Sequence, residues 1–247
     1  MASFSTYRLE EAFEEVGCPI CLLVAESEDA FLEQFLWEGV NDPFLRGRLL
    51  TSLGFCRDHA WQVVDKEARY GGTGVGIVYE HLGRQTLAAL ESHLKAERVR
   101  LALAPTGWRR AAQRWLKRLG LTRSSNASFD GLEPRTPCPA CQVRDEAEQR
   151  YASWLVEHLN DLRFRQAFAE SDGLCLPHLR LALALADEPA ARTFLIETMS
   201  QKIGTLAHDL SEYGRKHNWQ YRGEAKTENE LKSWIRAVAW FVGEKRG

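Results

Sequence analysis

The six cysteines and two of the seven histidines form one pattern that occurs twice in the chain. Each copy has a Cys-Pro-x-Cys motif followed by a Cys-x-x-His motif, and the second copy follows the first by 120 residues at the first cysteine and by 119 at the third. Three thiolates and one imidazole are a standard ligand set for tetrahedral zinc. The pattern therefore predicts eight metal ligands, which are Cys18, Cys21, Cys56 and His59 in the first copy and Cys138, Cys141, Cys175 and His178 in the second.

The spacing within each motif suits a metal site. A Cys-x-x-Cys turn presents two thiolates on the same side of the chain, and the prolines inside it, Pro19 and Pro139, stiffen it by fixing φ. A cysteine and a histidine three residues apart at the start of a helix also share one face. Gly54 and Gly173, two residues before each third cysteine, suit a backbone that bends sharply there. We expect a helical hairpin in each half to bring the two motifs of that half together.

The donor set favours zinc over an iron–sulfur cluster, because closed Cys₃His shells are typical of structural zinc. A 4Fe-4S cluster in each half, in an electron-transfer or redox-sensing protein, is the alternative, since clusters also use cysteine with occasional histidine ligation. Four protein ligands leave no position for water, so the pattern predicts no catalytic residue, no other cofactor and no enzymatic activity. An enzyme is the third hypothesis, and it requires that a substrate displace or replace the histidine.

The duplication extends beyond the candidate ligands. The segments NDPFLRGRLLTSLGFC and NDLRFRQAFAESDGLC align without gaps and share their Asn-Asp start, one arginine and the glycine before the cysteine. Such self-similarity indicates two similar structural halves. We predict an N-terminal half over residues 1–103 and a C-terminal half over 138–247, each built around its own Cys₃His site. Residues 104–137 between them predict a basic helix followed by a flexible linker.

Apolar residues recur with helical spacing, and no segment alternates as a strand does, so the sequence predicts an all-α fold. A helix is expected over residues 21–40, and a second one begins at Asp42-Pro43, where a capping side chain precedes proline. Residues 76–102 carry a leucine stripe, and residues 196–213 have apolar steps of three and four that suit a partner helix.

The last helix is expected to open with a capping box formed by Thr227 and Glu230. Its apolar side chains recur on one face, which is typical of a helix that packs against a core. We therefore expect six of them to be buried, namely Leu231, Trp234, Ile235, Val238, Phe241 and Val242.

The net charge of −2 argues against a general binder of polyanions, and a protein partner is expected. Residues 105–125 are the exception, because their basic side chains alternate with Trp108 and Trp115 and suit contact with an anionic membrane or nucleic acid. The alternative is that these tryptophans pack on the body of the protein. The start of the chain has no signal-peptide pattern and no run approaches 18 apolar residues, so we expect a cytoplasmic protein without a transmembrane segment.

Four segments together resemble a bacterial family of unknown function. They are CPICLL, VNDPFLRGRLLTSLGFCRDHAW, GGTGVGIVYEHL and RKHNWQYRGE, and the resemblance covers nearly the whole chain. It implies metal binding by the first-half ligands and their second-half counterparts, and it implies no reaction.

Overall fold

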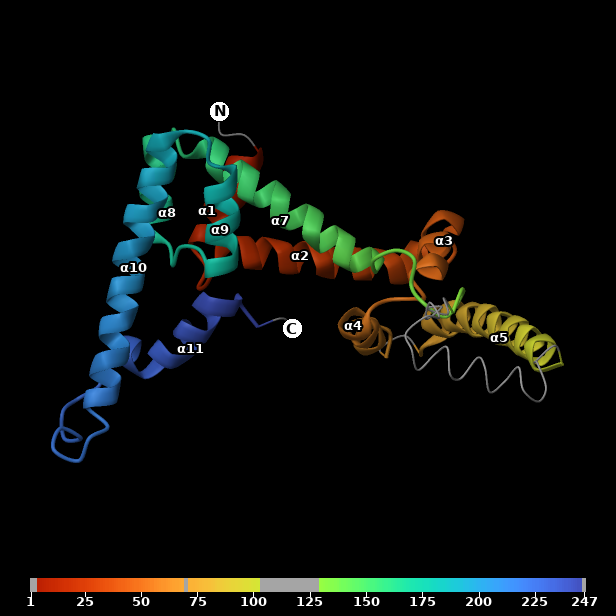
Figure 1. Ribbon diagram of the computed structural model, residues 1–247. Helices are drawn as coiled ribbons and strands as arrows, with labels where there is room; N and C mark the ends of the chain where they lie inside the picture. The colour runs from red at the N-terminus through yellow and green to blue at the C-terminus, as the bar shows by residue number, and fades with distance from the viewer. Residues whose placement is uncertain (1–3, 69–70, 103–128, 246–247) are drawn as a thin grey trace, which may run out of the picture. The chain divides into compact units, whose positions relative to one another are not determined.

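The computed structural model describes residues 4–68, 71–102 and 129–245 (Figure 1). Within these ranges all regular structure is helical and no strand occurs, which confirms the predicted all-α class. No helix in the described ranges is both long enough and apolar enough to cross a bilayer. The basic segment 105–125, singled out above for membrane or nucleic-acid contact, lies outside the described residues.

The chain divides into two compact units that do not follow the order of the sequence. The first unit comprises Met1–Phe31 and Gln142–Gly247, and the second comprises Leu32–Cys141. The first unit is therefore built from both ends of the chain, and the second unit from its middle. The predicted halves, residues 1–103 and 138–247, describe the duplication and not these compact units.

Among the described residues of the first unit, seven helices pack around one hydrophobic core. Phe13 contacts Phe164 and Phe168 edge to face, with ring centroids 5.1 and 5.6 Å apart. α2 meets α7 through the hydroxyls of Ser27 and Tyr151, which are 3.1 Å apart. The helices are α1 (Phe4–Phe13), α2 (Pro19–Gln34, which continues into the second unit), α7 (Pro139–His158, which begins in the second unit), α8 (Leu162–Glu170), α9 (Leu176–Leu185), α10 (Pro189–Arg215) and α11 (Glu228–Val242).

The second unit continues from the end of α2 into a short π-helix, η1 (Phe35–Gly39). Phe35 packs edge to face on Phe55, with ring centroids 4.9 Å apart. Asp42 caps the next helix by accepting from the amide of Phe44 at 2.9 Å, so the predicted helix start there is confirmed. The helices of this unit are α3 (Pro43–Thr51), α4 (Arg57–Glu67) and α5 (Thr73–Ala102).

The predicted capping box at the start of α11 is confirmed. The Glu230 amide donates to the Thr227 hydroxyl at 3.2 Å, and the Thr227 amide donates to the Glu230 carboxylate at 3.0 Å. Glu230 also binds Lys216 at 2.7 Å, and both side chains are about nine-tenths buried. The buried side of α11 therefore includes a polar pair, together with the fully buried Ser233.

The predicted burial of the apolar face of α11 is wrong. Each of its six apolar side chains is at least half exposed. The reason is that α11 packs on α10 and α9 through the side that carries Glu230 and Ser233, which is beside the apolar stripe and does not include it. The exposed fractions are 50% for Leu231, 52% for Trp234, 53% for Ile235, 59% for Val238, 58% for Phe241 and 71% for Val242.

Candidate metal centres

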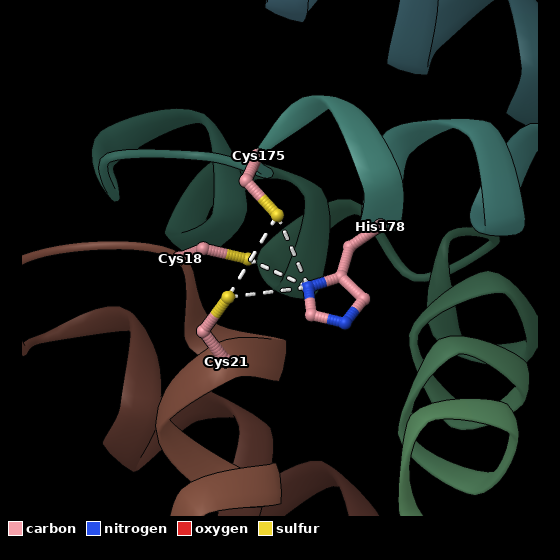
Figure 2. A group of neighbouring side chains, drawn as sticks. All are labelled: Cys18, Cys21, Cys175 and His178. Atoms are coloured by element: carbon pink, nitrogen blue, oxygen red, sulfur yellow. Dashed lines mark hydrogen bonds between the residues drawn. The ribbon is translucent and has the colours of Figure 1, made fainter. Parts of the chain in front are cut away.

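The first candidate metal centre lies in the first unit, where α2 and α9 begin. His178 Nδ1 lies 3.2 Å from the Sγ atom of Cys175 and 3.4 Å from those of Cys18 and Cys21 (Figure 2). The Sγ atoms of Cys21 and Cys175 are 3.7 Å apart. All four ligand atoms lie within 4.8 Å of one another, so they face one common point. We call this group the first site.

The second candidate metal centre lies in the second unit and has the same composition. His59 Nδ1 lies 3.1 Å from the Sγ atom of Cys56, 3.5 Å from that of Cys141 and 3.6 Å from that of Cys138. The Sγ atoms of Cys141 and Cys56 are 3.6 Å apart. These four ligand atoms also lie within 4.8 Å of one another, and we call them the second site.

The structure corrects how the motifs are paired. The sequence led us to expect that each half would supply all four ligands of one site. Instead, the Cys-Pro-x-Cys motif at Cys18 meets the Cys-x-x-His motif at Cys175, and the motif at Cys138 meets the one at Cys56. All eight predicted residues are brought together, but each site takes one motif from each repeat.

Local backbone geometry explains how each Cys-x-x-His motif presents two ligands. Cys56 and Cys175 are the N-cap residues of α4 and α9, with extended backbone, and each histidine follows in the first helical turn. Gly54 and Gly173 have φ of +91° and +80°, so both occupy the left-handed region that favours glycine. A Cβ atom on Gly173 would also lie 2.7 Å from the Met199 sulfur. The positive φ and this close contact both fit the expected need for glycine at a sharp bend.

The segment after α11 covers the first site, and the sequence analysis missed it. The backbone amide of Glu244 donates to the Cys21 sulfur, and its carboxylate accepts from the Cys18 amide at 3.4 Å. Gly243 has φ of +88°, and a Cβ atom there would lie 3.3 Å from the Cys21 sulfur. Hydrogen bonds from backbone amides to a ligating sulfur hold the sulfur in place and stabilise its negative charge. No pattern in the sequence indicates this contact, because the segment after α11 contains no metal-binding motif.

The pKa values of the ligands in the first site are shifted in different directions. Hydrogen bonds from Cys175 and Cys18, with smaller contributions from His178 and the Glu244 amide, lower the pKa of Cys21 despite its burial. Burial raises the pKa of Cys18 well above its usual range. Burial also opposes the charging of His178, but the Cys175 and Cys21 sulfurs outweigh it and raise the pKa of His178 to about 10. In the metal-free first site, Cys18 and His178 therefore hold protons that a metal ion must displace when it binds.

The second site also contains a cysteine whose pKa is lowered. Burial disfavours the charged form of Cys138. Its effect on the pKa is outweighed by hydrogen bonds from the His59 side chain and from the backbone amides of Cys56, Cys141 and Ala140. Together they lower the pKa of Cys138 to about 6. Amides that converge on a sulfur in this way stabilise a metal-bound thiolate.

Comparison with known proteins gives a family and a distant relative. The sequence pattern of a family of unknown function, DUF6062, matches residues 1–246. An uncharacterized 23.9 kDa protein in the xynA 3′ region of Caldicellulosiruptor sp. (strain Rt8B.4) is 24% identical over 234 residues, which cover 94% of this chain and 98% of that protein. No solved structure gives a significant match.

The crossed pairing predicts the metal content of double variants. In the variant with Cys18→Ser and Cys175→Ser, both changes fall in the first site, so we expect the second site to keep its metal ion. In the variant with Cys18→Ser and Cys56→Ser, each site loses one thiolate, so we expect both ions to be lost. Metal analysis after dialysis against a chelator distinguishes the two proteins, and the opposite result would support pairing within each repeat.

The pKa shifts predict which site releases metal first on acidification. In the metal-free first site the pKa of Cys21 is lowered, but Cys18 and His178 have raised pKa values and bind protons up to a higher pH than usual, so protons compete with the metal at two of the four ligands. Cys138 in the second site has a lowered pKa and competes less. Bound metal can be measured at stepwise lower pH in Cys56→Ser, which keeps the first site, and in Cys175→Ser, which keeps the second. We expect metal loss from the first site at the higher pH, and the reverse order would contradict this.

Proposed function

The chain belongs to the DUF6062 family of unknown function, and we propose that its two sites each bind a structural zinc ion in a helical interaction protein. The family carries no assigned activity, so the proposal depends on the geometry of the sites and on the exposed surface of α11.

The spacing of the ligand atoms is the observation that carries the zinc proposal. With Zn–S bonds of ~2.3 Å and Zn–N bonds of ~2.0 Å, a tetrahedral ion places two sulfurs ~3.8 Å apart and a sulfur and a nitrogen ~3.5 Å apart. The sulfur pairs that the structure joins are 3.6 and 3.7 Å apart, and the sulfur–nitrogen pairs are 3.1–3.6 Å apart. These distances match a tetrahedral ion, and the other pairs of ligand atoms in each site lie within 4.8 Å.

A 4Fe-4S cluster requires a wider set of ligands. In such a cluster each protein ligand binds a different iron, and the irons are separated by inorganic sulfide, so the ligand atoms lie outside a cube of eight atoms. The four ligand atoms of each site lie within 4.8 Å of one another, a spacing that matches ligands around a single ion. The spacing favours zinc over the cluster that the sequence left as the alternative.

A closed shell favours a structural role. The three sulfurs and one nitrogen occupy all four tetrahedral positions, so no position remains for a water or a substrate. Zinc bound in this way contributes ~10–16 kcal/mol of apparent binding free energy, which is comparable to the stability of a whole domain. On this proposal each ion holds together segments that are remote in the sequence.

Metal analysis tests the proposal directly. We expect protein purified without oxygen to be colourless and to contain one zinc ion per site, and the Co²⁺-substituted protein to show the visible bands of a tetrahedral thiolate complex. Removal of zinc should lower the thermal stability of the protein, because binding and folding are coupled. A brown protein that contains iron and sulfide and absorbs near ~400 nm would replace zinc with the cluster.

The exposed apolar face of α11 supports a role in protein interaction. Its six side chains recur at steps of three and four, so they form one continuous stripe on the helix. Contiguous apolar patches of this kind on a protein surface mark sites of association. Beside this stripe, the Lys216–Glu230 pair fixes the start of α11 to the end of α10, so the stripe is held in position.

A second copy of this chain is the partner that fits the stripe best. Two antiparallel α11 helices would bury identical stripes against each other, in the two-fold arrangement that most homodimers use. Exposed Glu228 at the first helical residue of one copy would then lie near exposed Lys245, just beyond the helix end of the other. The antiparallel arrangement therefore brings opposite charges together at both ends.

Sedimentation equilibrium tests the homodimer. We expect a particle of twice the 28.1 kDa chain mass, and we expect Val238→Glu at the centre of the stripe to weaken the dimer at least 10-fold by burying an unpaired charge. Leu162→Glu on α8, where Leu162 is 78% exposed, is the matched control and should leave the dimer unchanged. A monomeric wild-type protein, or a Val238→Glu dimer as stable as the wild type, would contradict the proposal. Metal content is measured on the same samples, so failure of the dimer is distinct from failure of the zinc sites.

A further inference from the structure

α11 is held at its start and at its end by different parts of the first unit. At its start, the Lys216–Glu230 pair binds it to α10, and near its middle Arg236 donates to Asp209 at 3.1 Å. Among the described residues beyond Arg236, only Glu244 has a side chain that makes a polar contact. The polar contacts that fix the second half of α11 therefore lie in the segment that follows the helix.

That segment ends on the first site. The Glu244 amide donates to the Cys21 sulfur, and the Glu244 carboxylate accepts from the Cys18 amide at 3.4 Å. Gly243 lies between the helix and Glu244, and a Cβ atom on it would be 3.3 Å from the Cys21 sulfur and 3.9 Å from the Cys175 sulfur. The end of α11 thus passes close to two of the three ligand sulfurs.

A cavity of about 410 Å³ adjoins the second half of α11. Ile235, Ala239 and Trp240 of α11 line it, together with Gly17 and Leu174, which directly precede two of the ligand cysteines. Atoms on the wall of a cavity lack part of the packing contacts that a filled core provides. The position of this half of the helix therefore depends more strongly on the contacts at its end.

A metal ion in the first site would fix the atoms to which Glu244 is bound. The Cys18–Cys21 motif lies at the start of α2, and the Cys175–His178 motif lies at the start of α9 (Figure 2). An ion bound by all four ligands ties these two helix starts together, so the Cys21 sulfur stays where the end of α11 reaches it. Without the ion the two starts can separate, and the Glu244 amide then has no fixed acceptor.

The end of α11 is also part of the exposed apolar stripe. Phe241 and Val242 are its last two helical residues, directly before Gly243. In the antiparallel homodimer proposed above, Lys245 of one copy lies near Glu228 of the other. A two-fold axis repeats each contact, so movement of this end would disturb both ends of the interface.

We propose that the first site and the α11 stripe are coupled through Glu244, which acts as a positioning residue. Metal binding in the first site strengthens docking of the stripe, and docking strengthens metal binding. Coupling between two sites is reciprocal, so both affinities change by one factor, which we expect to be at least ~5-fold. The inference rests on the proposed metal sites and homodimer. It assigns no such role to the second site, whose ligands lie in the second unit.

Hydrogen exchange at the end of α11 tests the coupling without requiring a dimer. The measurements use Val238→Glu, in which the charge on the stripe opposes dimer formation. When Cys175→Ser is added and empties the first site, we expect the amides of residues 240–244 to exchange at least ~10-fold faster, because the end of the helix opens locally. Cys56→Ser, which empties the second site, is the matched control and should leave this exchange unchanged. Residues 229–234 at the start of α11 should not respond to either change.

Glu244→Pro removes the amide donor without changing a metal ligand. In Cys56→Ser, which keeps the first site, we expect it to weaken metal binding at least ~10-fold, as loss of a hydrogen bond to a metal ligand commonly does. Glu244→Ala keeps the amide and should stay close to the parent affinity. In Cys175→Ser, which keeps the second site, Glu244→Pro should have no effect.

The Co²⁺ spectrum distinguishes positioning of the sulfur from general loosening of the unit. Loss of the N–H donor leaves more negative charge on the Cys21 sulfur. In Co²⁺-loaded Cys56→Ser, Glu244→Pro should therefore move the sulfur-to-cobalt charge-transfer band to lower energy, whereas Glu244→Ala should not.

Sedimentation equilibrium measures the effect of the metal on docking. Cys175→Ser should weaken the homodimer at least ~5-fold and Cys56→Ser should not, while Val238→Glu should weaken metal binding in the first site by the same factor. Metal content and the mass of the wild-type particle are measured on the same samples. They report failure of the proposed metal sites or homodimer, whereas the exchange of residues 240–244 reports failure of the coupling.

Two results would overturn the coupling. One is exchange of residues 240–244 that stays the same when the first site is emptied. The other is Glu244→Pro protein that binds metal in the first site as tightly as Glu244→Ala does. If Cys175→Ser speeds exchange at both ends of α11, the unit has loosened as a whole, and the comparison of Glu244→Pro with Glu244→Ala decides the result.

Discussion

The convergence of two thiolates from one repeat with a thiolate and an imidazole from the other is the constraint on which both units depend. In the first unit it joins the start of α2 to the start of α9, segments that belong to opposite ends of the chain. In the second unit it joins the start of α4 to the start of α7. Because each site takes one motif from each repeat, neither repeat completes a site by itself in this structure.

The entropy cost of loop closure is too small to prevent the pairing of motifs from different repeats. Pairing Cys21 with Cys56 would close a loop of 35 residues, whereas the observed pairing with Cys175 closes one of 154. Loop-closure entropy rises only with the logarithm of length, so the longer loop adds about 1 kcal/mol. Packing outweighs that difference, since Phe13 is buried against Phe164 and Phe168 in a core that only the two ends of the chain can form together.

The sequence predicted the local features well and the long-range ones poorly. The all-α class, the helix start at Asp42 and the capping box of Thr227 and Glu230 depend on neighbouring residues, and all three are confirmed. The pairing of motifs could not be predicted, because the two Cys-Pro-x-Cys motifs are chemically equivalent partners for either Cys-x-x-His motif. The burial of α11 was predicted wrongly for a related reason: periodicity identifies an apolar face but not what covers it. The contacts of Gly243 and Glu244 with the first site also required the three-dimensional arrangement.

The crossed pairing has a consequence for synthesis of the chain on the ribosome. The ligands of the second site run from Cys56 to Cys141, and they lie between the two motifs of the first site, at Cys18–Cys21 and Cys175–His178. The inner set is complete as soon as Cys141 leaves the exit tunnel, while the earliest cysteines still lack the residues they bind. The sites are therefore nested in time as well as in sequence. If the sites bind metal, the nascent chain would complete the inner set of ligands first, and Cys18 and Cys21 would lack their partners until Cys175 and His178 have been synthesised.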